Sequence, residues 1–383
     1  MAEGATPKVV VAGLGDTGLL VATRLGRDFD VVGVSTRPAL VSGQELGGRL
    51  TDPARWRRTY LVPYARVRKL DRIRTIHGRV TTVDLDARTV SVERSDGAEV
   101  TESYDVLVLA TGATNGFWRH DRMESMADID HGIEAIASQL RAASSVAVVG
   151  GGATGVSVAD NLARTGRSEV HLFHSGDYPL PGYHPKVRAW ITEVLRADGV
   201  SIHPDHRALL PAGFTGDKLT TGPVTWSTGQ EPFTADCTVW AVGHIRPHTD
   251  YLPDNVLDDD GFVLVDEFLA LEGYPDVFAV GDLAATDPHH SSARNWGWQV
   301  VLTNVRFRLG RGRRRRRFRA PHYRWGSILG IQAKGMVVAQ PTGRRFRIPR
   351  RTAESLLMRV FVTRYLYGGL RDEAGDKSVP SRP

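Results

Sequence analysis

The chain has 383 residues, 41% hydrophobic and 24% charged, which is typical of a globular protein of two or three domains and excludes a disordered chain. No apolar stretch reaches the roughly 18 residues of a membrane span, and the single cysteine excludes both an internal disulfide and a redox-active cysteine pair, so we expect an intracellular, cytoplasmic protein. The net charge of +6 is local, because the arginines at positions 311, 313–317 and 319 supply more than the whole excess.

The first predicted element is a buried strand, Val9 to Ala12, that runs into the glycine fingerprint Gly13-Leu14-Gly15-Asp16-Thr17-Gly18. An amphipathic helix and a second strand, Val31 to Val34, complete a βαβ unit. In a G-x-G-x-x-G turn the first glycine permits the tight turn, the second lets a pyrophosphate approach, and the third lets the helix pack closely. The alternative is a structural βα turn without a ligand.

The next part of the chain is predicted to pass from loop to sheet. Residues 36–70 show no clean period, and we expect loop and short helix there. Valines at 80, 83, 90, 92 and 100 alternate with polar residues and predict a three-stranded meander. The apolar run that ends in Ala110-Thr111-Gly112 predicts a buried parallel strand.

A second fingerprint, Gly150-Gly151-Gly152-Ala153-Thr154-Gly155, follows the apolar strand Val146 to Val149 and precedes another helix. Its unit closes with a strand ending in Ala241-Val242-Gly243, which echoes Ala110-Thr111-Gly112. One fingerprint alone is a weak signal, but two in complete strand-to-helix context indicate a chain that holds two dinucleotides and moves electrons between them. Without a cysteine pair, those electrons must pass through bound cofactors.

The chain is then predicted to return to its first sheet. Residues 274–282 predict a buried strand that ends at Gly281-Asp282, where the aspartate could also cap a helix. Residues 310–319 form an arginine-rich loop, 323–338 predict two strands, and 353–367 predict an apolar helix that needs a partner surface.

These features together resemble a known family. The two fingerprints, the Ala110-Thr111-Gly112 strand end and Val280-Gly281-Asp282 are similar to those of the pyridine-nucleotide flavoprotein oxidoreductases with two dinucleotide-binding domains. Without redox cysteines, the chain most resembles the branch of type II NADH dehydrogenases, apoptosis-inducing-factor-like proteins and ferroptosis-suppressor-like quinone reductases. We expect an α/β fold with two Rossmann-like three-layer domains, the second inserted in the first, plus a C-terminal β-hairpin and amphipathic helix.

The resemblance also divides the chain. It implies a discontinuous FAD-binding domain, an NAD(P)H-binding domain inserted in it, and a C-terminal basic and amphipathic segment. The expected ranges are 1–115 and 240–308 for FAD, 116–239 for NAD(P)H, and 309–383 for the C-terminal segment.

On the FAD side, the resemblance implies that the first fingerprint cradles the pyrophosphate, that Asp282 accepts hydrogen bonds from the ribityl chain, and that Thr111-Gly112 lies against FAD. Val80 would meet the adenine through its backbone. Ser35 replaces the carboxylate that the family places on the FAD ribose, and its hydroxyl can still bind there. The expected residues are Gly13, Gly15, Asp16, Thr17, Gly18, Ser35, Val80, Thr111, Gly112, Gly281 and Asp282.

On the nicotinamide side, the resemblance implies that the second fingerprint binds NAD(P)H. His174 stands where an acid would accept from the ribose 2′-hydroxyl and repel a 2′-phosphate, so NADPH is favoured over NADH. Ser157 stands where the family carries a glutamate near the nicotinamide, and it cannot replace that carboxylate. The expected binding residues are Gly150, Gly152, Ala153, Thr154, Gly155, His174 and Gly243, with Ser157 in the catalytic neighbourhood.

Residues 288–299 lie where the family starts the helix under the flavin, beside the acceptor site. Trp296 and Trp298 could stack on a flat acceptor and Arg294 could hold an anionic one, so we place all three in the catalytic neighbourhood. The alternative is that both tryptophans are core residues. The pair His289-His290 favours a loop, and we expect no metal, because no cysteine or acid cluster with ligand spacing accompanies it.

The arginine run allows three interpretations: a solvated loop, a contact with anionic lipid, or a nucleic-acid patch. The basic residues 344–351 and the helix at 353–367 would supply the second signal that peripheral membrane binding needs, at the inner face of a membrane. That helix could equally bury its face in a homodimer or against the flavin domain. Because the charge is local, we expect no nucleic acid as partner.

The sequence therefore predicts an FAD-dependent NAD(P)H oxidoreductase that works by a ping-pong mechanism and passes electrons to a quinone-like or other small acceptor. Two alternatives stay open. One is a reductase of a small redox protein such as a ferredoxin, for which a basic surface would suit an acidic partner. The other is a redox-sensing or lipid-docked flavin-binding protein with little turnover.

Overall fold

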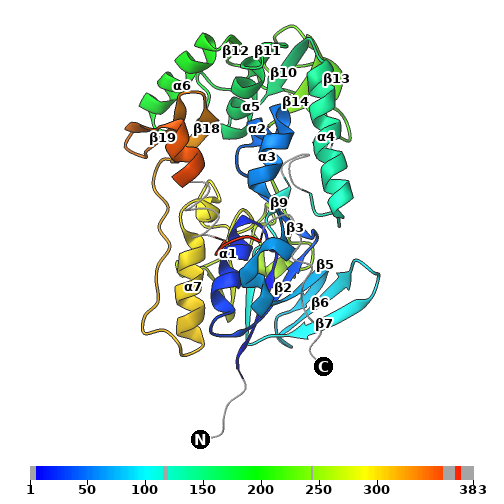
Figure 1. The fold of residues 1–383 in the computed structure, drawn as a ribbon, viewed down its shortest axis with the longest axis vertical. Helices are drawn as coiled ribbons and strands as arrows, with labels where there is room; N and C mark the ends of the chain where they lie inside the picture. The colour runs from blue at the N-terminus through cyan, green and yellow to red at the C-terminus, as the bar shows by residue number, and fades with distance from the viewer. Residues whose placement is uncertain are drawn as a thin grey trace, which may run out of the picture.

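The computed structural model describes residues 6–114, 120–214, 216, 218–242, 245–356 and 367–371. Figure 1 shows two lobes stacked along the long axis of the molecule, and the second lobe is inserted in the sequence of the first. The predicted α/β architecture is confirmed.

The lower lobe is built on a sheet with the order β16-β17-β8-β1-β2-β5-β6-β7. Its parallel strands are buried on both faces, which explains why they are continuous apolar runs in the sequence. α1 (Asp16–Leu25) and α7 (Gly297–Arg308) pack on one face of the sheet. The parallel part consists of β1 (Lys8–Ala12), β2 (Asp30–Ser35), β8 (Val106–Leu109), β17 (Tyr274–Ala279) and the start of β5 (Arg74–Asp84).

The predicted meander is confirmed at the edge of this sheet. β5, β6 (Thr89–Arg94) and β7 (Glu99–Ser103) are antiparallel, with Val80 opposite Val92. Shorter elements complete the lobe, namely β9 (Ala113–Thr114), β15 (Arg246–Pro247), β16 (Ala270–Leu271), and the 3-10 helices η1 (Tyr64–Arg66), η2 (Arg68–Arg72), η3 (Asp254–Val256) and η4 (Ser291–Ala293).

The region expected as loop and short helix also contains an antiparallel strand pair, β3 (Ala39–Val41) and β4 (Leu61–Pro63). Such short strands show no period that a sequence pattern could reveal. Between them lie α2 (Leu46–Thr51) and α3 (Pro53–Tyr60), which pack on the upper lobe although they belong to the N-terminal half of the chain (Figure 1).

The upper lobe is built on a sheet with the order β12-β11-β10-β14-β13, parallel except for β13. The strands are β10 (Ser145–Val149), β11 (Glu169–Phe173), β12 (Val200–His203), β13 (Thr220–Val224) and β14 (Phe233–Trp240), and the helices are α4 (Met126–Ala142), α5 (Ala153–Ala163) and α6 (Pro185–Ala197). This is the expected second βαβ unit.

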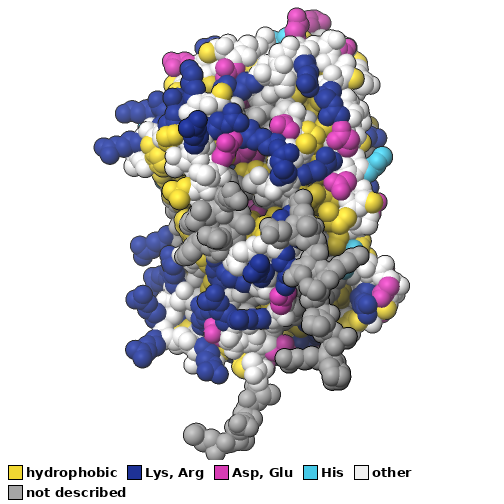
Figure 2. Space-filling view, viewed as in Figure 1, with side chains coloured by type: hydrophobic (Ala, Val, Ile, Leu, Met, Phe, Trp, Pro, Cys, Tyr) yellow, Lys and Arg dark blue, Asp and Glu magenta, His cyan; other side chains and the backbone are white. Residues whose placement is uncertain are grey.

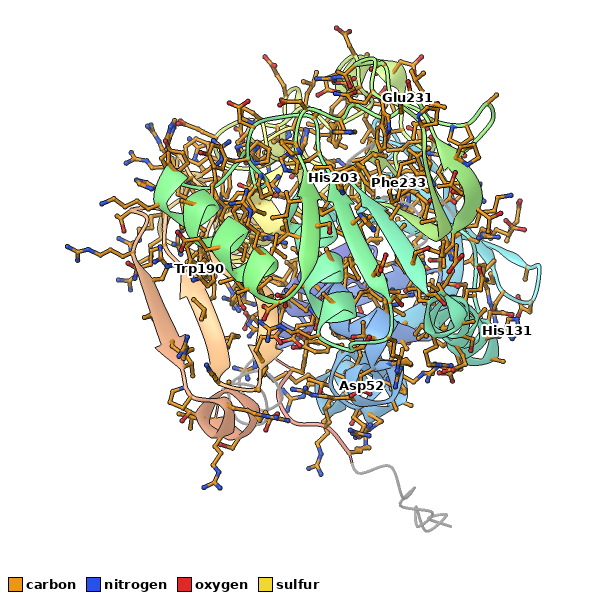
Figure 3. The ribbon with its side chains drawn as sticks, turned by 90° about the horizontal axis from the view of Figure 1, so that it is seen from above. Asp52, His131, Trp190, His203, Glu231 and Phe233 are labelled. Atoms are coloured by element: carbon orange, nitrogen blue, oxygen red, sulfur yellow. The ribbon has the colours of Figure 1, made fainter. Side chains whose placement is uncertain are left out.

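The expected C-terminal hairpin is β18 (Gly326–Gln332) and β19 (Gly335–Ala339), and a third strand, β20 (Arg345–Ile348), extends it. This sheet lies beside α6, where the Arg345 guanidinium stands 5.1 Å from the centre of the Trp190 ring (Figure 3). α8 (Arg350–Thr352) follows. Residues 357–366 of the expected apolar helix lie outside the described residues, and no helix in the described part is long and apolar enough to cross a membrane.

Candidate cofactor and electron-transfer site

The first fingerprint forms a tight turn at the carboxyl end of β1. Gly13 has φ +96° and donates its N–H to the Val34 carbonyl oxygen at 2.9 Å. A Cβ atom at Gly13 would stand 2.3 Å from the Ala110 carbonyl oxygen, and one at Gly18 would stand 1.8 Å from the Gly13 carbonyl oxygen. Only glycine therefore fits at either position.

The second fingerprint repeats this arrangement contact by contact. Gly150 has φ +127° and donates its N–H to the Phe173 carbonyl oxygen at 2.8 Å. A Cβ atom at Gly150 would stand 2.1 Å from the Ala241 carbonyl oxygen, and one at Gly155 would stand 1.8 Å from the Gly150 carbonyl oxygen. The strand ends at Ala110 and Ala241 therefore have similar sequences for a structural reason, because each packs directly against the first glycine of one fingerprint.

The middle glycine of each fingerprint faces open space. A Cβ atom at Gly15 or Gly152 would meet no other atom within 4 Å. Both glycines are N-cap residues, of α1 and α5, and a glycine has no side chain to satisfy the first N–H groups of the helix. Each fingerprint turn, residues 13–18 and 150–155 and here called a cradle, therefore has room at the positive end of a helix, where backbone N–H groups could hold a pyrophosphate.

Side chains beside the first cradle form hydrogen bonds with segments that the sequence pattern did not associate with it. Asp16 accepts hydrogen bonds from the Ser42 hydroxyl at 2.7 Å and the Gly43 amide at 2.8 Å. The Ser35 hydroxyl lies 3.1 Å from the Tyr64 hydroxyl, which donates to the Leu14 carbonyl oxygen at 2.8 Å. Burial raises the pKa of Tyr64, so its hydroxyl stays a donor.

The end of β8 carries a polar network. The Thr111 hydroxyl donates to the His248 carbonyl oxygen at 2.8 Å and lies 2.8 Å from the Tyr251 hydroxyl. The Gly112 carbonyl accepts from the His248 amide at 3.0 Å, and burial lowers the pKa of His248. Val80 lies in the core of the lower lobe, and its backbone contact with adenine stays a prediction.

Gly281 follows β17 with φ +103° and donates its N–H to the Ser292 hydroxyl at 2.8 Å, while that hydroxyl lies 3.0 Å from the Gly281 carbonyl oxygen. This pair holds the turn that carries Asp282. Because η4 begins only at Ser291 and α7 at Gly297, Asp282 does not cap a helix, and that alternative is wrong.

At the end of β11, the following loop folds back over the second fingerprint. Leu180 donates its N–H to the Gly151 carbonyl oxygen at 2.7 Å, and a Cβ atom at Gly151 would stand 2.6 Å from the Cβ of His174. His174 is 4% exposed, and apart from a backbone interaction with Gly176 its ring nitrogens have no hydrogen-bond partner among the described residues. Burial lowers the pKa of His174, so the ring is neutral at pH 7.

A cation near this strand end comes from α6. The positive charge of Arg188 contributes to the lowered pKa of His174. Its guanidinium stands 5.4 Å from the centre of the Tyr178 ring, and its Nε is buried without a hydrogen-bond partner among the described residues. Sequence reasoning missed Arg188 because it lies on the next helix. Of the other predicted residues, Ala153 and Thr154 begin α5, and Gly243 lies outside the described residues.

Ser157 lies at the contact between α5 and α2. It is 5% exposed, and α2 covers it: a Cβ atom at Gly47 would stand 2.4 Å from the Ser157 carbonyl oxygen and 2.8 Å from its hydroxyl oxygen. Position 157 therefore packs α5 on α2, and the placement of Ser157 in the catalytic neighbourhood stays a prediction.

The two tryptophans have different environments. Trp298 is 7% exposed in the core of the lower lobe, where the Arg24 guanidinium stands 4.4 Å from its ring centre, so the core alternative holds for this residue. Trp296 is 40% exposed at the N-cap of α7. Arg294 is exposed and its guanidinium lies 3.4 Å from the Tyr183 hydroxyl.

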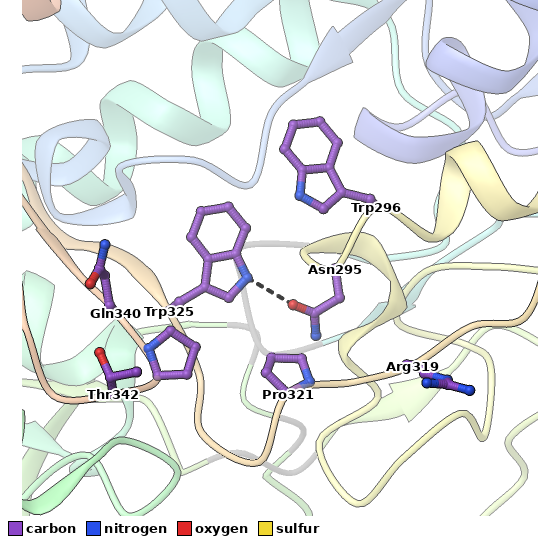
Figure 4. A pocket seen from close by; sticks show the side chains of 8 residues that line it. Asn295, Trp296, Arg319, Pro321, Trp325, Gln340 and Thr342 are labelled. Carbon is purple, nitrogen blue, oxygen red and sulfur yellow. Dashed lines mark hydrogen bonds between the residues drawn. The ribbon is translucent and has the colours of Figure 1, made fainter.

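Trp296 borders a hollow of about 490 Å³ (Figure 4). Trp325, which sequence reasoning missed, lies across it and donates its indole N–H to the Asn295 side-chain oxygen at 2.8 Å. The lining residues are Asn295, Trp296, Arg319, Pro321, Trp325, Gln340, Pro341 and Thr342. The hollow thus offers two indoles and a guanidinium to a flat, polar-edged molecule.

Comparison with known proteins agrees with this geometry. Residues 7–299 match the family described as pyridine nucleotide-disulphide oxidoreductase. The chain belongs to this family. FAD and NAD(P)H are the cofactors expected for a member of this family.

The chain is 27% identical to oxidoreductase ptaL of Pestalotiopsis fici, over 57% of this chain and 58% of the relative, and 27% identical to ferroptosis suppressor protein 1 of Xenopus tropicalis, over 60% and 63%. It therefore spans about three fifths of the length of these relatives. It is 26% identical to type II NADH:quinone oxidoreductase NdhA of Mycobacterium tuberculosis, over 74% of this chain and 67% of the relative.

Solved structures show the same fold. A water-forming NADH oxidase from Lactobacillus brevis bound to NADH has a TM-score of 0.61 at 19% identity, covering 87% of this chain and 75% of the other. The covalent putidaredoxin reductase–putidaredoxin complex has a TM-score of 0.61 at 20% identity, covering 88% and 87%. The expected two-domain oxidoreductase fold is thereby confirmed.

Proposed function

We propose that the chain oxidises NAD(P)H with FAD bound in the first cradle and the nicotinamide coenzyme in the second, and that the electrons pass to a quinone-like or other small acceptor. The matched geometry of the two cradles carries this proposal. FAD, when bound, supplies a two-electron acceptor for the hydride of NAD(P)H. The likeness to a type II NADH:quinone oxidoreductase supports a quinone as the acceptor.

The proposed domains are 1–115 and 240–308 for FAD and 116–239 for NAD(P)H, with 309–383 as the C-terminal segment. The two sheets support this division, since β1, β8 and β17 share one sheet and β10 to β14 share the other. α2 and α3 belong by sequence to the first domain but pack on the second.

The segment from Ser42 to Gly47 joins the two cradles. Its start is bonded to Asp16, directly after Gly15, and its end packs on Ser157, two residues after Gly155. We propose that this bridge fixes the separation of the two cofactors, which electron transfer between them requires to be short.

We propose NADPH as the preferred coenzyme. The strand end near its ribose carries no acid, His174 is neutral, and Arg188 supplies an N–H donor and a positive charge that suit a 2′-phosphate. We further propose that the acceptor stacks between Trp296 and Trp325 and that Arg294 and Arg319 lie at its polar edge.

Paired substitutions test the two cradles. Gly15→Val and Gly152→Val each place a Cβ where no atom beyond the chain neighbours lies within 4 Å, so both variants should fold and melt close to the flavin-free wild type while a pyrophosphate is excluded. Gly15→Val should be colourless. Gly152→Val should keep the flavin spectrum and lose its bleaching by NADPH, while dithionite still reduces it. A Gly15→Val protein with full flavin absorbance would refute the assignment.

A second candidate function is reduction of a small redox protein, which the arginine-rich segment favours. Turnover of one preparation with a soluble ubiquinone analogue and with an iron–sulfur protein separates the two acceptors. No turnover with either would instead support a redox-sensing protein.

A further inference from the structure

Residues 310–325, here called the arginine strap, run from the end of α7 to the start of β18 (Figure 1). The strap has no helix or strand, yet its backbone is fixed. The buried side chain of Asn304 accepts from the Arg316 amide at 2.7 Å and donates to the Arg316 carbonyl oxygen at 2.9 Å. The Phe318 amide donates to the Glu267 carbonyl oxygen at 2.7 Å. The interpretation of this run as a freely solvated loop does not account for these bonds.

Several guanidinium groups of the strap are also held in place. Arg315 stands 4.0 Å from the centre of the Phe268 ring, and Arg317 lies over the same ring and pairs with Glu267 at 3.2 Å. Arg316 donates to the Gln299 side-chain oxygen at 3.1 Å. Their directions are therefore set before any partner arrives.

The charge of the strap is largely uncompensated. Within the described part of the chain, Glu267 is the carboxylate that pairs with it, and no ion pair involves Arg311, Arg313, Arg314 or Arg319, which are all exposed. Figure 2 shows Lys and Arg side chains gathered along the left edge of the molecule, over the strap and over the C-terminal sheet. Like charges held together repel one another, and an anionic partner would offset this repulsion.

The far end of the strap lines the hollow beside Trp296. Arg319, Pro321 and Trp325 form one side of it. A molecule bound to the strap would therefore lie next to the site where the electrons are proposed to leave the protein. A protein partner is favoured over anionic lipid because the guanidinium groups of Arg315, Arg316 and Arg317 are held in fixed directions.

We propose that the arginine strap is the docking surface for an acidic electron-carrier protein, which receives electrons at the edge of the Trp296 hollow. This inference rests on the proposed function for its supply of electrons. One NAD(P)H gives up two electrons and becomes NAD(P)⁺ with release of one proton, so two one-electron carriers are reduced in succession. Guanidinium groups held in fixed directions can form paired hydrogen bonds with carboxylates that are held in place on a protein surface.

Binding of an acidic [2Fe–2S] ferredoxin tests the proposal directly, by titration calorimetry on the flavin-loaded protein without nicotinamide. Arg313→Glu/Arg314→Glu reverses two exposed charges. Arg167→Glu/Arg196→Glu makes the same change in net charge on exposed positions of the upper lobe. We expect the strap variant to bind at least tenfold more weakly and the control to stay within twofold, with the wild-type affinity falling as salt is raised.

Equal losses in the two variants would overturn the proposal, because net charge alone would then explain binding. Absence of ferredoxin binding at low salt would also overturn the proposal. Binding of phosphatidylglycerol vesicles that only the strap variant loses would overturn it in favour of a lipid surface. Melting curves confirm that both variants fold. Binding with no electron transfer from NADPH would leave the docking surface supported and would refute the proposed function instead.

Discussion

Gly47 of α2 and Ser157 of α5 are in direct contact, with no room for a single added carbon between them. The pair joins the segment bonded to the first fingerprint to the helix that starts at the second. It therefore connects the two cradles mechanically, and it explains why position 157 carries a small residue.

Gly47→Ala should destabilise the protein, because its Cβ atom would stand 2.4 Å from backbone that cannot move without shifting α2 or α5. We expect a loss of about 2 kcal/mol in the free energy of unfolding, as for overpacked cores. The neighbouring Gly48→Ala is the matched control, since its Cβ atom would reach only the Glu45 side chain at 4.0 Å. Urea unfolding of both variants checks this, and equal stabilities would contradict the contact.

Arg188→Ala should change coenzyme choice without changing the fold. Removing the guanidinium takes away the donor proposed for the 2′-phosphate, so the Kd for adenosine 2′,5′-bisphosphate should rise roughly tenfold or more, as expected for a lost charged hydrogen bond. The Kd for 5′-AMP should stay unchanged. Arg196→Ala, on an exposed position of the same helix, is the control. If both ligands weaken equally, Arg188 does not recognise the phosphate.

Glu124→Gln should lower stability in a pH-dependent way. Burial alone would raise the pKa of Glu124, but the hydrogen bond from His120 and the guanidinium of Arg37 lower it to about 2. Because the folded pKa lies below the ordinary value of 4.5, the unfolded chain binds this proton more readily. The side chain therefore stabilises the fold fully above pH 4.5 and progressively less toward pH 2.

We expect Glu124→Gln to cost on the order of 3 kcal/mol at pH 7, and the difference from wild type to shrink below pH 4.5. Unfolding at pH 7, 5 and 3.5 measures this difference. Glu193→Gln, at an exposed position of α6, should show no such trend. A difference that is constant down to pH 3.5 would remove the electrostatic explanation.

Trp298→Ala and Trp296→Ala should separate packing from acceptor binding. Trp298 is in the core of the lower lobe, so its truncation should cost about 3–5 kcal/mol. Trp296 is half-exposed at the hollow, so Trp296→Ala should change stability little and raise the KM for a quinone acceptor. Thermal melts and steady-state kinetics of the pair provide the test. A Trp296 variant with an unaltered KM would remove this residue from the acceptor site.

Several features of the site depend on tertiary contacts and could not be predicted from the sequence. Arg188, Tyr64 and Trp325 reach the site from elements far along the chain, and the contact of Gly47 with Ser157 joins two helices that are distant in the sequence. No local period or spacing records such pairs, because they depend on how the elements pack. The same reason separates Trp296 from Trp298, which are neighbours in sequence and differ in burial.

The sequence by itself determined the two glycine turns, the meander and the return of the chain to its first sheet. These features follow from local rules: a glycine is required where a Cβ would strike the adjacent strand end, as at Gly13 and Gly150, and apolar residues alternate where one face of a strand is covered. The tertiary structure alone decided how far apart the cradles stand and which side chains surround them, since both depend on the packing of α2 against α5.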